Sequence, residues 1–178
     1  MEELKIVKIN DRVYHIYESL GVYCTLIVGS KAALLIDTGF GFGDILGKVK
    51  TITHLPIKVI NTHGHVDHIQ GNKFFDDIML HGDDSKLIKF HSSFLLKLFI
   101  YIAERKNLNF EEKKNTSKFF QKNIQKLEYI SDGYLIDLGD RVLEIIHMPG
   151  HTQGSICILD KKDRILFSGD SISNDIWL

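Results

Sequence analysis

Short apolar runs alternate with turn residues through the first part of the chain. Val, Ile, Leu and Tyr dominate four such runs, at 4–9, 13–18, 22–28 and 33–36. The pairs Asn10-Asp11 and Gly29-Ser30 stand between runs, and such pairs are typical of turns. The pattern therefore predicts an antiparallel meander of four β-strands.

After the meander, helical and strand patterns alternate. A helix is predicted over 44–53, with Ile45, Leu46 and Val49 on one side, and Pro56 precedes a compact apolar strand at 57–61. Four later strands are predicted at 134–137, 141–147, 155–159 and 164–167. This alternation indicates a layered α/β fold, not a pure β-sandwich.

Between these parts lies a segment of different composition, predicted to be a helical insertion at 83–130. Its residues 83–127 carry ten basic and five acidic side chains, a net charge of +5. Phe120, Ile124 and Leu127 recur at helical spacing, opposite a row of lysines at 118, 122 and 126, which predicts an amphipathic helix.

The stretch 94–103 is apolar at every position except Lys97. A helix there is hydrophobic nearly all round, and we expect it to bury more than one face. It could line a hydrophobic substrate channel or pack against a second copy of the chain. Packing against a second copy is the favoured interpretation, because long apolar segments more often end in cores and interfaces than in pockets.

The amino-acid composition and charge indicate the class of protein. The 178 residues are 44% hydrophobic, and 22 basic side chains balance 23 acidic ones, for a net charge of −1. This is typical of a single globular domain over 1–178 and disfavours nucleic acid as a partner, since phosphate binding usually needs a basic excess. No secretory signal and no membrane span are expected, and two distant cysteines, Cys24 and Cys157, suggest reduced thiols and the cytoplasm.

Chemistry is concentrated in the run Thr62-His63-Gly64-His65-Val66-Asp67-His68. In an extended segment, side chains at i and i+2 point the same way, so His63 and His65 can bind one metal ion together. If a helix follows, Asp67 and His68 project to a second position beside the first. Gly64 is expected to let the backbone pass close to the ions.

Three other segments add single candidates at strand ends. His151 lies in a Pro/Gly turn between two predicted strands, and Asp170 follows the apolar strand that ends near Phe167. Asp37 ends another strand and could hold a ligand imidazole by its second nitrogen, or simply cap the turn that follows. Each is weak alone, but together with the histidine run they complete a metal site.

In this order, the four segments resemble the metallo-β-lactamase-fold superfamily, most specifically in the H-x-H-x-D-H run. The resemblance implies an αββα sandwich with the site at one edge between two mixed sheets. It also implies which residues hold metal: His63, His65 and His151 for a first ion, Asp67 and His68 for a second, and Asp170 bridging both.

The resemblance has a limit at the C-terminal end. Members of the superfamily supply one more histidine to the second ion from a later loop, and residues 171–178 contain none. The closing βα units are therefore expected to be missing. We expect the sheet edge with Ile165 and Phe167 to be exposed unless a homodimer covers it, and hydrolysis by this chain alone to be impaired.

The implied activity is metal-dependent hydrolysis of a small-molecule ester, thioester or lactone by a metal-bound hydroxide, with Asp67 managing the proton. Two zinc ions fit the His and carboxylate ligands best, although iron or manganese also fits. The closest overall likeness is to glyoxalase II-like and lactonase-like hydrolases.

Other interpretations remain open. One is a truncated remnant that binds metal or a partner and turns nothing over. Less favoured are a mononuclear iron dioxygenase and a nuclease. Flavodiiron oxidoreductases are disfavoured, because they characteristically have Glu where this chain has His65.

Overall fold

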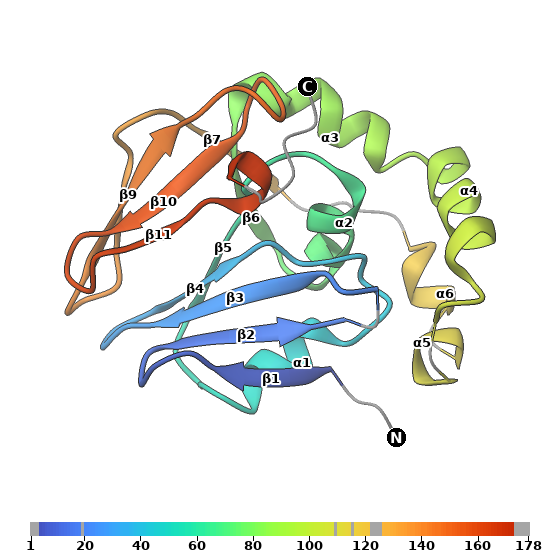
Figure 1. Ribbon diagram of the computed structural model, residues 1–178, viewed down its shortest axis with the longest axis horizontal. Helices are drawn as coiled ribbons and strands as arrows, with labels where there is room; N and C mark the ends of the chain where they lie inside the picture. The colour runs from blue at the N-terminus through green and yellow to red at the C-terminus, as the bar shows by residue number, and fades with distance from the viewer. Residues whose placement is uncertain (1–3, 19, 109, 115, 122–125, 173–178) are drawn as a thin grey trace.

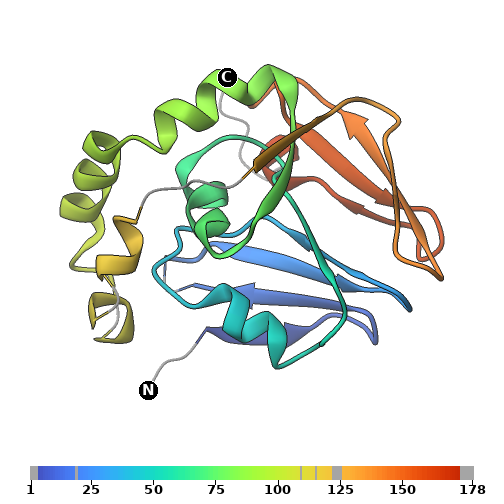
Figure 2. The same ribbon diagram turned by 180° about the vertical axis from the view of Figure 1, so that it is seen from behind.

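Two β-sheets face each other in the structure, and helices lie on the outside of the first sheet and beside the site edge (Figures 1 and 2). The structure is a computed structural model that describes residues 4–18, 20–108, 110–114, 116–121 and 126–172. The predicted layered α/β class is confirmed.

The first sheet has seven strands in sequential order. These are β1 (Lys5–Lys8), β2 (Val13–Tyr17), β3 (Tyr23–Val28), β4 (Ala33–Ile36), β5 (Ile57–Ile60), β6 (Asp77–His81) and β7 (Lys126–Ile130). Strands β1 to β4 pair antiparallel, which confirms the predicted meander, and β4 to β7 pair parallel. No strand was predicted from the sequence at β6.

The second sheet is antiparallel, in the order β11-β10-β9-β8. Its strands are β8 (Leu135–Asp137), β9 (Val142–His147), β10 (Ile156–Asp160) and β11 (Ile165–Phe167). All four strands were predicted, with ends within one residue of those observed.

A continuous apolar core fills the space between the sheets. Ile27 and Leu34 from the first sheet meet Ile145 and Ile158 from the second, all fully buried. Ile165 and Phe167 are partly buried against this core. The expectation that they are exposed was therefore wrong: along β11 they alternate with the exposed Leu166 and face inward.

Helix α1 (Ile45–Lys50) covers the outer face of the first sheet, where Ile45 and Val49 pack against a cluster that includes Leu26 and Leu35. Shorter elements follow strand ends: α2 (Val66–Ile69), η1 (Gln70–Phe74), η2 (Gly82–Asp84) and η3 (Gly169–Ser171).

Four helices form the insertion between β6 and β7: α3 (Ser85–His91), α4 (Phe94–Glu104), α5 (Phe110–Lys114) and α6 (Thr116–Phe119). The insertion is helical as predicted, but its predicted end and the amphipathic helix through Leu127 were wrong. Lys126 and Leu127 begin β7, which pairs in parallel with β6 as the last strand of the first sheet. Lys122 and Ile124 lie outside the described residues.

Helix α4 buries its lysine and turns apolar side chains outward. Its one charged side chain within 94–103, Lys97, is only 2% exposed, while Phe94, Leu95 and Phe99 face outward. Lys97 Nζ donates to the carbonyl of Gln121 at 2.9 Å, and burial lowers the Lys97 pKa to about 8. The expected burial of several apolar faces is therefore wrong within the single chain. None of the described helices is long and apolar enough to cross a bilayer.

Candidate metal centre

The site edge is set by the parallel strands β4, β5 and β6, whose carboxyl ends meet at one side of the first sheet. The chain leaves β4 into Asp37, β5 into the run 61–68, and β6 into Asp84. Ligands of α/β proteins commonly bind at such carboxyl ends. Three segments far apart in sequence therefore present side chains to the same place.

His63, His65 and His151 form a compact group of imidazoles. His63 Nε2 lies 3.0 Å from His65 Nδ1, which lies 3.0 Å from His151 Nε2. One nitrogen from each ring lies within 4.8 Å of the others. Three nitrogens at this spacing can surround a single ion, as the i, i+2 pattern predicts for His63 and His65.

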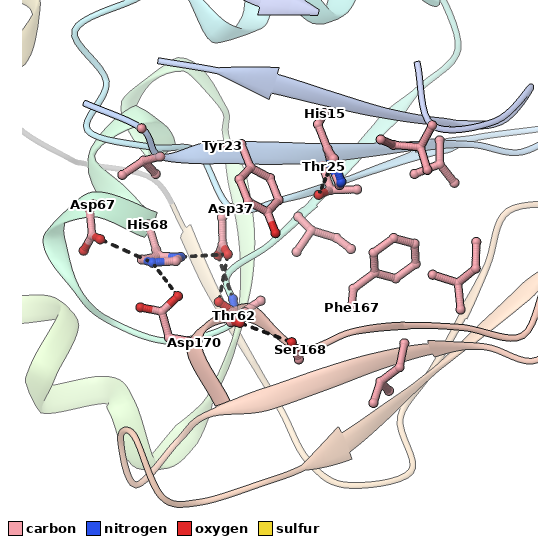
Figure 3. Close-up of a pocket in the computed structure, with 18 residues that line it drawn as sticks. His15, Tyr23, Thr25, Asp37, Thr62, Asp67, His68, Phe167, Ser168 and Asp170 are labelled. Atoms are coloured by element: carbon pink, nitrogen blue, oxygen red, sulfur yellow. Dashed lines mark hydrogen bonds and ion pairs between the residues drawn. The ribbon is translucent and has the colours of Figure 1, made fainter. Parts of the chain in front are cut away.

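A second group surrounds His68, with Asp67 and Asp170 next to its ring (Figure 3). His68 Nε2 lies 3.5 Å from an oxygen of Asp67 and 3.5 Å from Asp170 Oδ1. The other oxygen of Asp170 lies 3.5 Å from His151 Nε2. The Asp170 carboxylate therefore faces both groups.

Asp37 orients the second group from behind. Its Oδ2 lies 2.9 Å from His68 Nδ1 and accepts from the Thr62 hydroxyl, while Oδ1 accepts from the Thr62 backbone N–H. Asp37 has a φ of 61°, a left-handed conformation that Asp adopts more readily than most residues. The Nδ1 contact leaves His68 Nε2 facing Asp67 and Asp170.

The two groups differ in charge. Burial, with the neighbouring His68, lowers the His63 pKa to about 3, so its imidazole is neutral and has a free lone pair. At His68, burial opposes protonation, but the carboxylates of Asp37, Asp170 and Asp67 raise the pKa well above its ordinary value. The hydrogen bond from His68 in turn lowers the Asp170 pKa to about 2.

Asp84, which was not predicted, connects the two loops that carry the imidazoles. Its fully buried carboxylate accepts from Gly64 N, Gly154 N and the Thr152 hydroxyl, each at 2.8 Å. A Cβ at Gly154 would lie 2.6 Å from Asp84 N, so only glycine fits this approach. The sequence gives no signal that separates Asp84 from the other acids of the insertion.

Gly64 lies close against α3. A Cβ there would lie 3.1 Å from the backbone nitrogen of Ile88 and 3.3 Å from Leu87 Cβ. The glycine therefore makes room for α3.

His91, at the end of α3, is a further contact that was not predicted. Its Nδ1 accepts from the Val66 backbone N–H at 3.1 Å, and its carbonyl accepts from Gln70 Nε2 at 2.7 Å. Its ring centroid lies 5.0 Å from that of His65. The insertion is thereby fixed directly to the histidine run.

His81, Asp83 and His147 form a third group, outside the predicted site. The two rings stack with centroids 3.8 Å apart and planes at 15°, so their lone pairs lie in nearly parallel planes and cannot converge on one ion. His147 Nε2 already lies 2.9 Å from the carbonyl of Gln153. This arrangement supports the His151 loop and does not form a tetrahedral site.

Curated proteins of related sequence span several organisms. The chain is 29% identical over 160 residues to the acyl-coenzyme A thioesterase MBLAC2 of Homo sapiens, covering 83% of this chain and 57% of that protein. It is 30% identical over 152 residues to an uncharacterized protein of Mycobacterium bovis, covering 79% and 62%. The chain therefore spans little more than half the length of these relatives.

Solved structures of similar fold are metallo-β-lactamases. One from Cronobacter sakazakii superposes with a TM-score of 0.63 at 17% identity, covering 93% of this chain and 61% of that one. A class B3 di-zinc enzyme from an Alaskan soil metagenome gives 0.61 at 20%, with the same coverages. The sequence profile described as the metallo-beta-lactamase superfamily matches residues 18–78 and 89–178. On this match, together with the fold, the chain belongs to the metallo-beta-lactamase superfamily.

Proposed function

We propose that this chain carries the site of a metal-dependent hydrolase that cleaves acyl thioesters, with esters and lactones as chemically related substrates. The observation that supports this most is the convergence of six side chains on one sheet edge: His63, His65, His151, Asp67, His68 and Asp170. In this proposal the first three hold one zinc ion, Asp67 and His68 hold a second, and Asp170 bridges them. Iron or manganese would suit the same donors.

The donor set fits zinc in its chemistry. Zinc is bound by neutral imidazole and by carboxylate oxygen, and His63 is neutral because of its burial. Metal-ligating histidines usually contact a second group through their other ring nitrogen, as His68 does with Asp37 and His63 does with the Thr62 hydroxyl at 3.1 Å. Both rings are thus held with one nitrogen facing the site.

When bound, zinc supplies a water with a pKa near 7 and a charge that polarises a carbonyl. The chain's own residues would position and move the proton. The Asp67 side chain remains partly exposed, and although burial raises its pKa, the hydrogen bond with His68 gives a net lowering, so it stays ionised and can accept a proton. Asp37, which is buried behind His68, acts only on the orientation of that ring.

The size of the adjoining cavity supports a small-molecule substrate. A cavity of about 360 Å³ opens beside Asp67, His68 and Asp170 and runs between β2, β3 and β11 (Figure 3). Val13 and Phe167 line its apolar part. An acyl group can occupy the apolar part while its thioester carbonyl lies at the carboxylates, and the similarity to an acyl-coenzyme A thioesterase favours this bond among the candidates.

We further propose that 1–178 forms one domain, because a single apolar core joins both sheets. Both cysteines are free and buried, which supports a reducing compartment such as the cytoplasm.

The test is acyl-coenzyme A hydrolysis, followed by release of free thiol, with the chain loaded with zinc or stripped by chelator. The proposal expects turnover, slower than is typical of such hydrolases, that depends on zinc and is lost in His65→Ala, while Leu135→Ala, which truncates an exposed side chain on β8, leaves it intact. Turnover that persists without metal would contradict the proposal. Bound zinc with no turnover of thioesters, esters or lactones would favour the non-catalytic metal-binding alternative.

A further inference from the structure

The apolar face of α4, defined as Phe94, Leu95, Leu98, Phe99 and Ile102, is the largest feature of the insertion that the site does not explain. These side chains are 37% to 78% exposed. They follow one another at i, i+1, i+4, i+5 and i+8, which places them on one side of the helix. The outward side of α4 is therefore continuously apolar.

The helix contains a lysine that could face water in place of these apolar side chains. Lys97 is instead buried, and its ammonium donates a hydrogen bond to the carbonyl of Gln121. The two phenylalanines alone expose roughly 250 Å². With the three aliphatic side chains, the face is comparable to the largest contiguous apolar patch of a typical monomer, and such patches are often functional.

Exposed basic residues flank α4 in the sequence on both sides. Lys86 and Lys89 are exposed on α3 before it, and Arg105 and Lys106 are exposed directly after it. Residues 85–114 carry seven basic and three acidic side chains in sequence. One of the acids, Glu104, accepts a hydrogen bond from Asn107.

The basic residues distinguish between two possible partners of the apolar face of α4, a second copy of the chain and a lipid surface. If two copies met through α4, parallel or antiparallel, the cations at the helix ends would face the cations of the other copy, and like charges across an interface are costly. An anionic lipid surface presents the opposite charge to the same cations and accepts the apolar side chains at the boundary between headgroups and acyl chains.

We propose that the apolar face of α4 docks on an anionic membrane surface, with Lys86, Lys89, Arg105 and Lys106 contacting the lipid headgroups. The docked helix lies in the plane of the surface and does not cross it, since it has 11 residues. The adjoining helix α3 ends at His91, which is bonded to Val66 and Gln70. Docking would therefore hold the candidate metal centre close to the lipid.

The test is sedimentation of the 178-residue chain with vesicles of phosphatidylcholine alone or with 30% phosphatidylserine. We expect binding to the anionic vesicles, weakened by salt, and little binding to the neutral ones. Replacing both lysines in the pair Lys86→Gln, Lys89→Gln should weaken binding about 25-fold, at about fivefold for each basic side chain. This result requires no change to the apolar face, so it does not depend on how well α4 tolerates substitution.

Leu95→Glu with Phe99→Glu should abolish binding, whereas Leu135→Glu, an exposed apolar position on β8, should not. Circular dichroism would confirm that each variant is folded. Equal binding to neutral and anionic vesicles, no binding to either, or unchanged binding of the Leu95 and Phe99 variant would overturn the proposal. So would a vesicle-free dimer in sedimentation velocity that Phe99→Glu dissociates, which would make a second copy the occupant. Failure of the proposed hydrolysis would leave this test unaffected.

Discussion

Asp84→Asn is expected to lower both the zinc affinity of the candidate metal centre and the free energy of unfolding of the chain. The wild-type carboxylate accepts one hydrogen bond on Oδ1, from Gly154 N, and two on Oδ2, from Gly64 N and the Thr152 hydroxyl. An amide keeps the volume but replaces one accepting oxygen by a donor. One orientation of the amide leaves Gly64 N without an acceptor, and the other leaves Gly154 N without one.

The expected cost follows from these contacts. A hydrogen bond to a charged acceptor contributes about 1.5 to 3 kcal/mol, and a buried unsatisfied donor costs a similar amount. Losing one or two such bonds should lower the free energy of unfolding by about 2 to 5 kcal/mol. Because the same carboxylate holds the His63–His65 segment against the His151 loop, zinc affinity should also fall, by about 10- to 100-fold.

The assay is zinc titration by competition with a chromogenic chelator, beside urea unfolding of the metal-free chain. Asp160→Asn is the matched control, because Asp160 is equally buried and accepts from Arg141 Nη1 and the backbone of Lys162 and Asp163, away from the site. It should lose stability and keep zinc affinity. If Asp84→Asn binds zinc as tightly as the wild type, or if Asp160→Asn weakens binding as much, then Asp84 does not position the histidine loops for zinc.

Three further predictions concern the histidines and Asp37. His65→Ala should remove most bound zinc, measured by plasma emission on protein refolded without chelator, and unchanged zinc content would reject this ligand. Asparagine tolerates the left-handed backbone conformation of Asp37, so Asp37→Asn should fold but bind zinc about 10- to 100-fold more weakly. A crystal structure with Asp37 bonded directly to zinc would contradict its orienting role. Lowering the pH from 7 to 5 should destabilise the metal-free chain by about 2 kcal/mol through His63, because its pKa of about 3 in the folded state lies below 6.5, so only the unfolded chain takes up the proton. The raised pKa of His68 offsets less than half of this loss, because its stabilisation is complete below the unfolded pKa of about 6.5 and is only slightly smaller at pH 7. Urea curves of equal or greater stability at pH 5 would contradict the prediction.

The sequence predicted those parts of the fold in which a local pattern and the tertiary environment agree. The meander over 4–36 alternates regularly and has strong turn residues, and the spacing of His63, His65, Asp67 and His68 restricts their directions. Asp170 and His151 could be placed only through the resemblance, because neither residue has a local pattern that points to a partner distant in sequence.

Features that depend on long-range contacts were not predictable in the same way. The end of the insertion was misplaced because Lys126 and Leu127 fit a helical period, yet pairing with β6 decides their conformation. Asp84 became recognisable only from the three donors that reach it from two loops. The apolar stretch 94–103 gave no indication that Lys97 would be the residue turned inward.

Anomalous diffraction at the zinc edge, on crystals of the zinc-loaded chain, would locate the metal directly. We expect one peak about 2.0 to 2.1 Å from a nitrogen of each of His63, His65 and His151, and a second beside Asp67, His68 and Asp170. No peak among these residues, or zinc held instead by His81, Asp83 and His147, would contradict this expectation.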